Sequence, residues 1–160
     1  MGRIDKENYY LDIAQTVAGR STCLRRCYGA ILVKSDEIIS TGYNGAPRGR
    51  RNCVDLSYCT REALNIPSGE RYELCRSVHA EANAIISAAR SEALGATLYM
   101  ACVEPDTGAL IPGSTSCSMC RRLIINAGIE RVVIRDTRTE YRVVEVADGL
   151  REDDSLPRSL

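Results

Sequence analysis

The order of strand-like and helix-like segments most restricts the fold that this 160-residue chain can adopt. Residues 6–18 carry apolar side chains at helical spacing and predict an opening amphipathic helix. Residues 28–33 and 37–41 are short and rich in strand formers, and the polar residues between them predict an antiparallel hairpin.

The second half of the chain continues this alternation. Residues 80–90, rich in alanine and isoleucine, predict one helix, and residues 117–127 predict another that ends at Gly128 in a C-cap position. The remaining predicted strands are residues 97–102, 131–134 and 141–146. A hairpin followed by alternating helices and strands indicates an α/β domain with helices on both faces of a mixed sheet.

Two stretches lack this periodicity. Residues 42–47 (GYNGAP) predict a loop, because Asn-Gly and a following proline favour turns. Residues 48–76 contain three cysteines and a Pro-Ser-Gly break, and a loop of this length needs something to tie it down. We expect one domain over residues 1–150 and a charged, frayed tail over residues 151–160.

The composition argues against nucleic-acid and membrane partners. With 21 basic and 21 acidic side chains the formal charge is zero, whereas a nucleic-acid surface normally carries a basic excess. No run approaches the ~18 apolar residues of a membrane span, and the charged start is unlike a signal peptide. We therefore expect a cytoplasmic protein. In a reducing compartment its eight cysteines favour metal ligands or buried thiols over disulfides.

Two short motifs place metal-binding side chains at predicted helix starts: His79-Ala80-Glu81 and Cys117-Ser118-Met119-Cys120. Cys117 and Cys120 lie one helical turn apart, so both sulfur atoms can face one point. The positive end of the helix dipole favours the thiolate form that zinc needs. With His79 as a third ligand, the fourth tetrahedral position is left for water, which is typical of a catalytic zinc.

This arrangement predicts a hydrolytic deamination. Zinc lowers the pKa of a bound water to roughly 7, and Glu81 is placed to move protons between that water and the substrate ring nitrogen. Each motif alone is weak, because a lone histidine is more often an ordinary core or surface residue and a lone C-x-x-C also serves redox or structural roles. Their combination in this order is the pattern of zinc deaminases.

Longer strings resemble the dCMP deaminases of the cytidine deaminase-like superfamily. The resemblance runs from about Tyr10 to Val146 and goes beyond the superfamily's minimal zinc pattern. The matching strings are residues 20–23 (RSTC), 40–49 (STGYNGAPRG), 68–76 (SGERYELCR), 79–85 (HAEANAI) and 117–129 (CSMCRRLIINAGI). In this family, proline usually precedes the first cysteine of the pair. Here Ser116 stands in its place, where it could act as an N-cap.

The resemblance implies a three-layer α/β/α fold and the hydrolysis of dCMP to dUMP and ammonia, which supplies dUMP for thymidylate synthesis. It also implies a homo-oligomer, commonly a hexamer, that dCTP activates, with Mg²⁺ accompanying this effector, and that dTTP inhibits. In the superfamily an asparagine after the second strand contacts the sugar. Asn44 holds that place, and the neighbouring Tyr43 is a further substrate-binding candidate.

The resemblance further implies a second, structural zinc. The cysteines at the corresponding positions are Cys23, Cys53, Cys59 and Cys75. Four thiolates would form a closed site and would tie residues 48–76 to the first helix. The alternative is four unrelated buried thiols. Cys27 and Cys102 fall within or beside predicted strands and are expected to be core residues.

A monophosphate substrate needs fixed cations or helix N-termini. The candidate arginines are Arg20, Arg25, Arg26, Arg48, Arg121 and Arg122. We favour Arg26, with Tyr141 as a hydroxyl donor, although each arginine taken singly fits a solvated surface charge.

Other functions stay open at this point. The enzyme alternatives are deaminases of dCTP, of a free nucleoside, of tRNA adenosine, or of a pterin-like or riboflavin precursor. From a different class, the chain could be a non-catalytic zinc scaffold or nucleotide sensor. Glu81 argues against that reading, because a structural metal site has no use for a proton shuttle.

Overall fold

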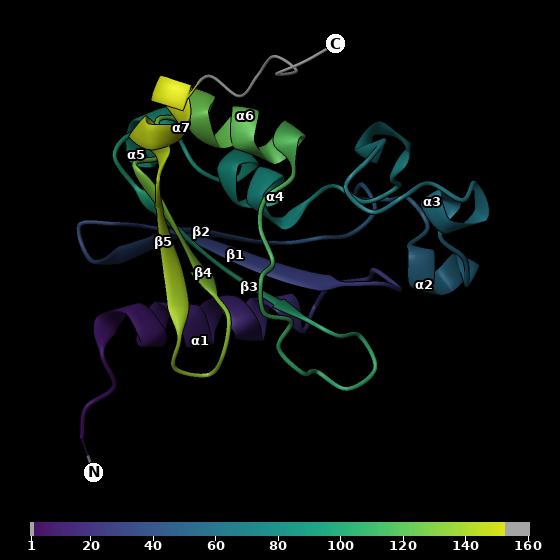
Figure 1. The fold of residues 1–160 in the computed structure, drawn as a ribbon, viewed down its shortest axis with the longest axis horizontal. Coiled ribbons are helices and arrows are strands. Elements are labelled where there is room, and N and C mark those ends of the chain that lie inside the picture. The colour runs from purple at the N-terminus through teal and green to yellow at the C-terminus, as the bar shows by residue number, and fades with distance from the viewer. Residues whose placement is uncertain (1, 153–160) are drawn as a thin grey trace.

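A five-stranded mixed sheet forms the centre of the computed structural model, which describes residues 2–152 (Figure 1). Its strands are β1 (Cys27–Lys34), β2 (Glu37–Tyr43), β3 (Thr97–Val103), β4 (Arg131–Arg135) and β5 (Tyr141–Glu145). They lie in the order β2-β1-β3-β4-β5, with β3 and β4 parallel and every other neighbouring pair antiparallel. The expected mixed sheet is therefore confirmed.

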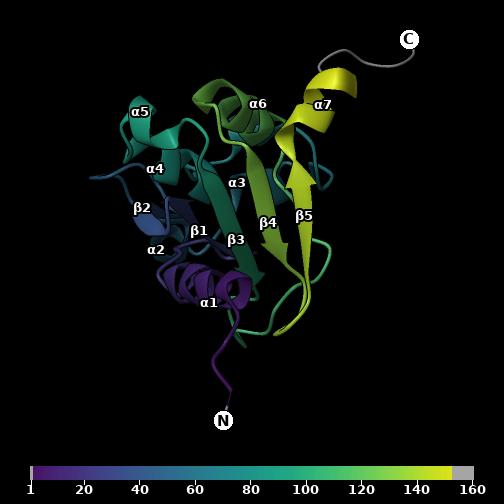
Figure 2. The same ribbon diagram turned by 90° about the vertical axis from the view of Figure 1, so that its left-hand side faces the viewer.

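Helices cover both faces of this sheet, which confirms the three-layer α/β/α architecture (Figure 2). The helices are α1 (Lys6–Ala18), α2 (Cys53–Leu56), α3 (Thr60–Ala63), α4 (Ala80–Ile86), α5 (Arg90–Ala93), α6 (Ser118–Ala127) and α7 (Val146–Glu152). Helix α1 lies on one face, and α4 and α6 lie on the other. Successive side chains of β1 serve the two layers in turn, so that Ile31 packs with α1 and Leu32 with α4 and α6.

Two glycines allow helices to approach the sheet closely. A Cβ atom added at Gly29 of β1 would lie 2.0 Å from the carbonyl oxygen of Ala14 in α1. On the opposite face, a Cβ atom at Gly42 of β2 would lie 2.4 Å from both the carbonyl oxygen of Ala80 and the amide nitrogen of Ala84 in α4. The backbone of α4, which begins next to His79, therefore rests directly on β2.

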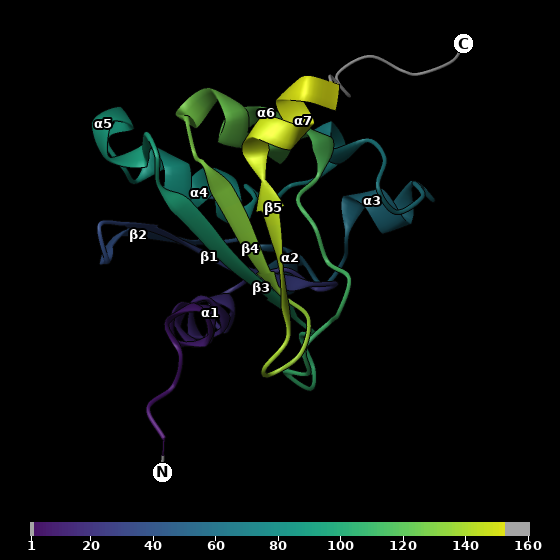
Figure 3. The same ribbon diagram turned by 60° about the vertical axis from the view of Figure 1, so that its left-hand side comes forward.

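The sequence predicts most elements, with four differences. Strand β2 continues to Tyr43, into the predicted loop, because Gly42 and Tyr43 still pair with β1. The helix expected at residues 80–90 ends at Ile86, and α5 is a separate short helix. Residues 48–76 contain α2, α3 and the 3₁₀ helix η1 (Tyr72–Leu74), with α2 and α3 beyond one end of the sheet (Figure 1) and α3 well to one side of the strands in Figure 3.

The fourth difference is at the C-terminal end. The predicted last strand stops at Glu145, and Val146 begins α7, where a charged tail was expected after Leu150. Residues 153–160 of that expected tail lie outside the described residues. Across residues 2–152, no helix combines the length and the apolar character that a membrane span requires.

Candidate metal centre and substrate cavity

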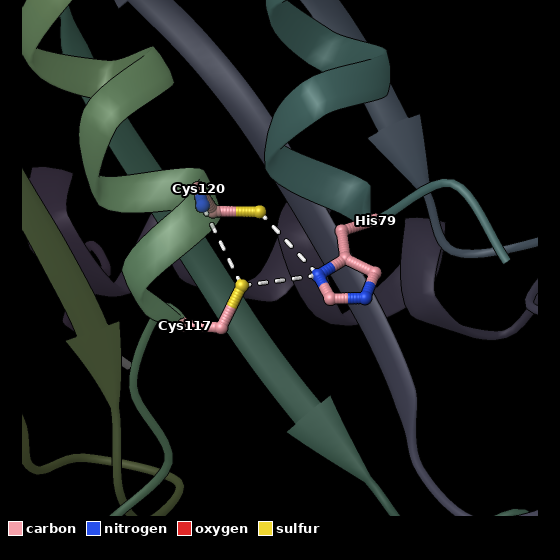
Figure 4. Close-up of side chains that lie close together, drawn as sticks. All are labelled: His79, Cys117 and Cys120. Carbon is pink, nitrogen blue, oxygen red and sulfur yellow. Dashed lines mark hydrogen bonds between the residues drawn. The ribbon is translucent and has the colours of Figure 1, made fainter. Parts of the chain in front are cut away.

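Three predicted ligands meet where α4 and α6 begin on the same face of the sheet (Figure 4). His79 is the N-cap residue of α4, Cys117 is the N-cap residue of α6, and Cys120 lies in the first turn of α6. The Nδ1 atom of His79 is 3.4 Å from each of the two sulfur atoms. Within residues 2–152, this is the only group of at least three His, Cys, Asp or Glu side chains whose ligand atoms all lie within 4.8 Å of one another.

These separations suit a tetrahedral zinc ion. Zinc binds sulfur at about 2.3 Å and imidazole nitrogen at about 2.0–2.1 Å, so neighbouring ligands of one ion lie roughly 3.5 Å apart. The observed nitrogen–sulfur distances of 3.4 Å match this value. The donor set of one imidazole and two thiols leaves one tetrahedral position for water or substrate. The three residues present therefore fit a catalytic rather than a closed structural zinc.

The site favours thiolate at Cys117. Its sulfur accepts a hydrogen bond from the backbone N–H of Cys120 at 3.5 Å. A hydrogen bond from the Cys120 side chain, together with one from His79, lowers the pKa of Cys117 to about 4. The same contact raises the pKa of Cys120, and the hydrogen bond with Cys117 raises the pKa of His79 to about 10. A thiolate at a helix start is the form that binds a metal ion.

Glu81 lies beside this group, in the first turn of α4, and is only 4% exposed. Burial raises the pKa of its carboxyl above the ordinary value for glutamate. The side chain lines the same cavity as His79 and Cys117. A buried carboxyl that faces a cavity beside a metal site can accept and return a proton, as the sequence predicts for Glu81.

A cavity of about 390 Å³ opens in front of His79, Glu81 and Cys117. Its other lining residues include Arg25, Arg26, Tyr28, Asn44, Arg61, Tyr72 and Thr115. Two of the predicted substrate-binding residues, Asn44 and Arg26, thus line the cavity. The other two do not line it: Tyr43 is an exposed residue of β2, and Tyr141 begins β5, the edge strand farthest from β2.

Asn44 is buried and fixed by its neighbours. Its Oδ1 atom accepts hydrogen bonds from the backbone N–H of Tyr28 at 2.9 Å and from the hydroxyl of Ser21 at 2.5 Å. Its Nδ2 atom donates to the carbonyl oxygen of Arg26 at 2.9 Å, and no other hydrogen bond from Nδ2 occurs within residues 2–152, so its second hydrogen is available to a ligand. Asn44 therefore joins the end of β2 to the segment before β1 and orders one wall of the cavity.

Three arginines line the cavity, and one of them was not among the sequence candidates. Arg25 pairs with Glu62, with 2.9 Å between Nε and Oε1, and a hydrogen bond to Tyr28 is the main cause that raises the pKa of Arg26. Arg61 is the missed residue, and it is 5% exposed. It lies in the segment without periodicity, so no pattern around it signals burial. The other candidates do not line the cavity: they are Arg20, Arg48, Arg121 and Arg122.

The four cysteines expected at a structural zinc lie near one another without forming a compact ligand group. Burial is the main cause that raises the pKa of Cys53, and the charges of the other three add to it. Those three are among the residues that line the cavity: Cys23, Cys59 and Cys75. All eight cysteines are free thiols in the structure, and both Cys27 and Cys102 are buried, as expected.

Ser116 is not the N-cap that the sequence suggested. Cys117 takes that position, because its sulfur accepts from the backbone N–H of Cys120. The hydroxyl of Ser116 is buried instead, 3.5 Å from the sulfur of Met100 in β3. The serine therefore anchors the loop on the sheet one residue before the metal ligand.

A charged pair, Asp136 just after β4 and Arg142 on β5, holds the same loop. The carboxylate of Asp136 accepts hydrogen bonds from Arg142 at 2.7 and 2.9 Å and from the backbone N–H of Gly113 at 2.7 Å. Arg142 also donates to the carbonyl oxygen of Ser114 at 2.5 Å. The two side chains thus fix residues 113–114, three and four positions before Cys117.

Comparisons with known proteins agree with this geometry. The family model described as the cytidine and deoxycytidylate deaminase zinc-binding region matches residues 4–136. The deoxycytidylate deaminase of Mycobacterium phage D29 is 41% identical over 138 residues, which span 83% of this chain and 96% of the phage protein. The Schizosaccharomyces pombe deoxycytidylate deaminase is 35% identical over 127 residues, 79% of this chain but 36% of the yeast protein. The chain thus spans about a third of the yeast relative's length.

A solved structure shares the fold. The dCMP deaminase of cyanophage S-TIM5, in complex with dCMP and dUMP, superposes on this chain with a TM-score of 0.57. The match is 24% identical and covers 94% of each chain. At that identity it supports the α/β/α architecture.

Proposed function

Because this chain belongs to the cytidine and deoxycytidylate deaminase family, we propose that it hydrolyses dCMP to dUMP and ammonia. The observation that carries the proposal is the meeting of His79, Cys117 and Cys120 beside the buried Glu81, at the wall of a cavity of about 390 Å³. A scaffold or sensor would need the metal ligands but no buried carboxyl in the cavity.

The residues divide the reaction between them. His79, Cys117 and Cys120 would hold a zinc ion, which would lower the pKa of a bound water. Glu81 would take one proton from the attacking water and deliver it to the ring nitrogen N3 while the water oxygen bonds to C4. Glu81 would then take the remaining proton from the new C4 hydroxyl and deliver it to the exocyclic amine, so that the C4–N bond breaks and ammonia leaves. One water is consumed, and the product carries a carbonyl oxygen in place of the amine.

The cavity wall offers groups for the rest of the nucleotide. Asn44 has one free Nδ2 hydrogen beside the cavity, which supports its assignment to the sugar. Arg26 lines the cavity and is assigned to the phosphate side. The assignments of Tyr43 and Tyr141 to the substrate stay predictions, because neither residue lines this cavity.

An assay of ammonia release from dCMP, dCTP, CMP and deoxycytidine by zinc-loaded protein tests the proposal. We expect dCMP to be the preferred substrate, and we expect Glu81→Gln to abolish its turnover while the metal stays bound. Glu73→Gln is a matched control, because Glu73 is an exposed glutamate outside the cavity. Failure of the wild-type protein to release ammonia from any cytosine compound, with zinc bound, would reject the enzyme.

The proposal includes a second, structural zinc held by four cysteines. Cys23, Cys59 and Cys75 all line the cavity, and the fourth cysteine, Cys53, begins α2 in the insertion. Metal analysis of purified protein is expected to give two zinc ions per chain, and one in Cys53→Ser. A value of one in the wild-type protein would favour the alternative of unrelated thiols.

We extend the proposal to a homohexamer that dCTP, with Mg²⁺, activates and that dTTP inhibits. Exposed apolar side chains on β5 and α7, among them Val143, Val144 and Leu150, offer surface for association between chains. Light scattering with and without dCTP and Mg²⁺, alongside the dCMP assay, tests both parts. A monomeric protein would contradict the proposed hexamer, and a rate of dCMP turnover that changes with neither dCTP nor dTTP would contradict the proposed regulation.

A further inference from the structure

Arg61 is a buried cation in a part of the chain that is otherwise exposed. It belongs to α3, and it is 5% exposed, whereas residues 62–65 and 67–70 that follow it are exposed. Burial of an arginine requires that its donors be satisfied. The reason for this burial is not an ion pair, because no carboxylate in the described part of the chain lies within salt-bridge distance of Arg61.

Backbone carbonyls and one aromatic ring hold the guanidinium in place. Its Nε and Nη2 atoms donate to the carbonyl oxygen of Glu70 at 3.1 and 2.8 Å, and Nη2 also donates to the carbonyl oxygen of Pro67 at 2.8 Å. The guanidinium carbon lies 4.2 Å above the ring centroid of Tyr72. These contacts fix the orientation of the planar fork before any ligand arrives.

The contacts leave one edge of the guanidinium available. Within residues 2–152, the Nη1 atom of Arg61 donates no hydrogen bond. This atom is also not fully buried, so a ligand can reach it. Arg61 lines the same cavity as His79 and Glu81. A fixed positive charge with two free N–H donors therefore borders the space in front of the metal ligands.

The position of Arg61 relative to the metal centre suits one end of a nucleotide. Tyr72 contacts both Arg61 and His79, and its ring meets the imidazole edge-on with 5.3 Å between the centroids. The guanidinium carbon is thus no farther from the imidazole centroid than the sum of 5.3 and 4.2 Å. A nucleotide whose base lies at the metal centre can therefore place its phosphate within reach of Arg61.

We propose that Arg61 is a substrate-binding residue, whose Nη1 edge binds the phosphate of the nucleotide and so selects a monophosphate over the free nucleoside. This inference rests on the proposed function and adds to it a residue that lies outside the two metal-site motifs, residues 79–81 and 117–120. The other two cavity arginines, Arg25 and Arg26, are exposed, and Arg25 pairs with Glu62, so Arg26 can at most share the phosphate with Arg61. Of these three arginines, Arg61 alone is buried, and no carboxylate in residues 2–152 pairs with it.

Binding of dUMP and of deoxyuridine to zinc-loaded protein, measured by calorimetry, tests the role without relying on turnover. Since a charge-assisted hydrogen bond contributes about 10- to 100-fold in affinity, Arg61→Gln should weaken dUMP binding by this factor. Binding of deoxyuridine should not change. Arg61→Lys, which keeps the charge but not the fork, should give an intermediate loss. Arg71→Gln is the matched control on an exposed arginine of the same segment and should change neither affinity.

Two results would overturn the role of Arg61. One is an equal loss of dUMP and deoxyuridine binding, or a loss of zinc, in Arg61→Gln, since either would mean that Arg61 only holds the insertion together. The other is a variant that still prefers dUMP to deoxyuridine as strongly as the wild type does. Failure of the proposed function looks different, because the wild-type protein would then neither deaminate dCMP nor prefer dUMP.

Discussion

At the scale of single residues, Arg135 is a buried charge whose contacts stabilise the fold. Its side chain is 1% exposed at the end of β4. It donates to the carboxylate of Asp12 at 2.6 Å, to Gln15 at 2.9 Å and to the side chain of Asn8 at 3.0 Å, all three in α1. The helix on the face opposite the metal centre is thus tied to β4 by polar contacts as well as by apolar packing.

Replacing Arg135 by leucine should destabilise the protein without changing the chemistry of the site. The change leaves buried acceptors on Asn8 unpaired, which costs about 1–3 kcal/mol in the free energy of unfolding. Chemical denaturation of Arg135→Leu and wild type measures this difference. Asp12→Asn is the control, because Asp12 is half-exposed and its loss should cost less. An unchanged denaturation midpoint in Arg135→Leu would contradict the structural role.

The residues of the metal site were more predictable than the residues around them. His79, Glu81, Cys117 and Cys120 lie within two short motifs, and the spacing inside each motif determines how its side chains are arranged on one helix start. Arg61 and the cavity wall depend on where the insertion folds back, which no local pattern records. Tyr141 was assigned to the phosphate from its residue type alone, and the register of β5 places it away from the cavity.

At the scale of elements, the contact between α4 and β2 determines where His79 and Glu81 stand. Gly42→Ala would place a methyl group 2.4 Å from the backbone of α4, so the helix must move. We expect a loss of about 1–3 kcal/mol in stability, together with lower zinc content and lower activity. Metal analysis and denaturation of the purified variant measure these effects.

Gly29→Ala is the matched control for Gly42→Ala. It forces an even closer contact, 2.0 Å to the carbonyl oxygen of Ala14, but with α1 on the other face of the sheet. Its stability should fall by a similar amount while the protein that remains folded keeps its zinc. Equal loss of zinc in the two variants would mean that the glycine at position 42 has no special relation to the site.

The loop before Cys117 should respond to pH through Asp136. The guanidinium of Arg142 lowers the pKa of this carboxyl in the folded state below the ordinary value of about 3.9. The pair therefore stabilises the fold above that value, and the contribution is lost as the pH falls through the lower, folded pKa. Asp136→Asn should be less stable than wild type by about 1 kcal/mol or less near pH 7, since Arg142 is partly exposed.

Thermal unfolding of both proteins between pH 7 and pH 3 measures this dependence. The two unfolding temperatures should converge toward the acid end of the range. A difference that stays constant across the range would mean that the ionised carboxylate is not the stabilising form.

The elements themselves were largely predictable, and the exceptions have local causes. The bounds of α1 agree with the pattern, because Asp5 caps the helix by accepting from the backbone N–H of Asn8 at 2.9 Å. Helix α7 was missed, since Gly149 and the adjacent acidic residue weaken its helical signal. Strand β2 extends two residues beyond its predicted end at Thr41, because pairing with β1 overrides the turn preference of Gly42 and Tyr43.

At the scale of the whole molecule, the metal ligands lie on two helices that are far apart along the chain, with α5 and β3 between them. A zinc ion bound by His79, Cys117 and Cys120 would join the starts of α4 and α6. Removal by a chelator should therefore lower the unfolding temperature, because a ligand that binds only the folded state stabilises it, by about 4 kcal/mol at a thousandfold excess over its dissociation constant.

Calorimetric scans with and without chelator check this expectation, and Glu81→Gln is the control because it leaves the three ligands intact. The control should show the same shift as wild type. An unfolding temperature that does not depend on the chelator would contradict a metal that links the two helices.

The separation of these ligands along the chain also has a consequence for synthesis. His79 precedes Cys117 by 38 residues, and β3 lies between them. A growing chain on the ribosome exposes the histidine and the carboxyl of Glu81 well before Cys117 or Cys120 emerges. The metal centre can therefore be completed only after β1, β2 and β3 have left the exit tunnel, and a truncated product that stops before Cys117 cannot form it.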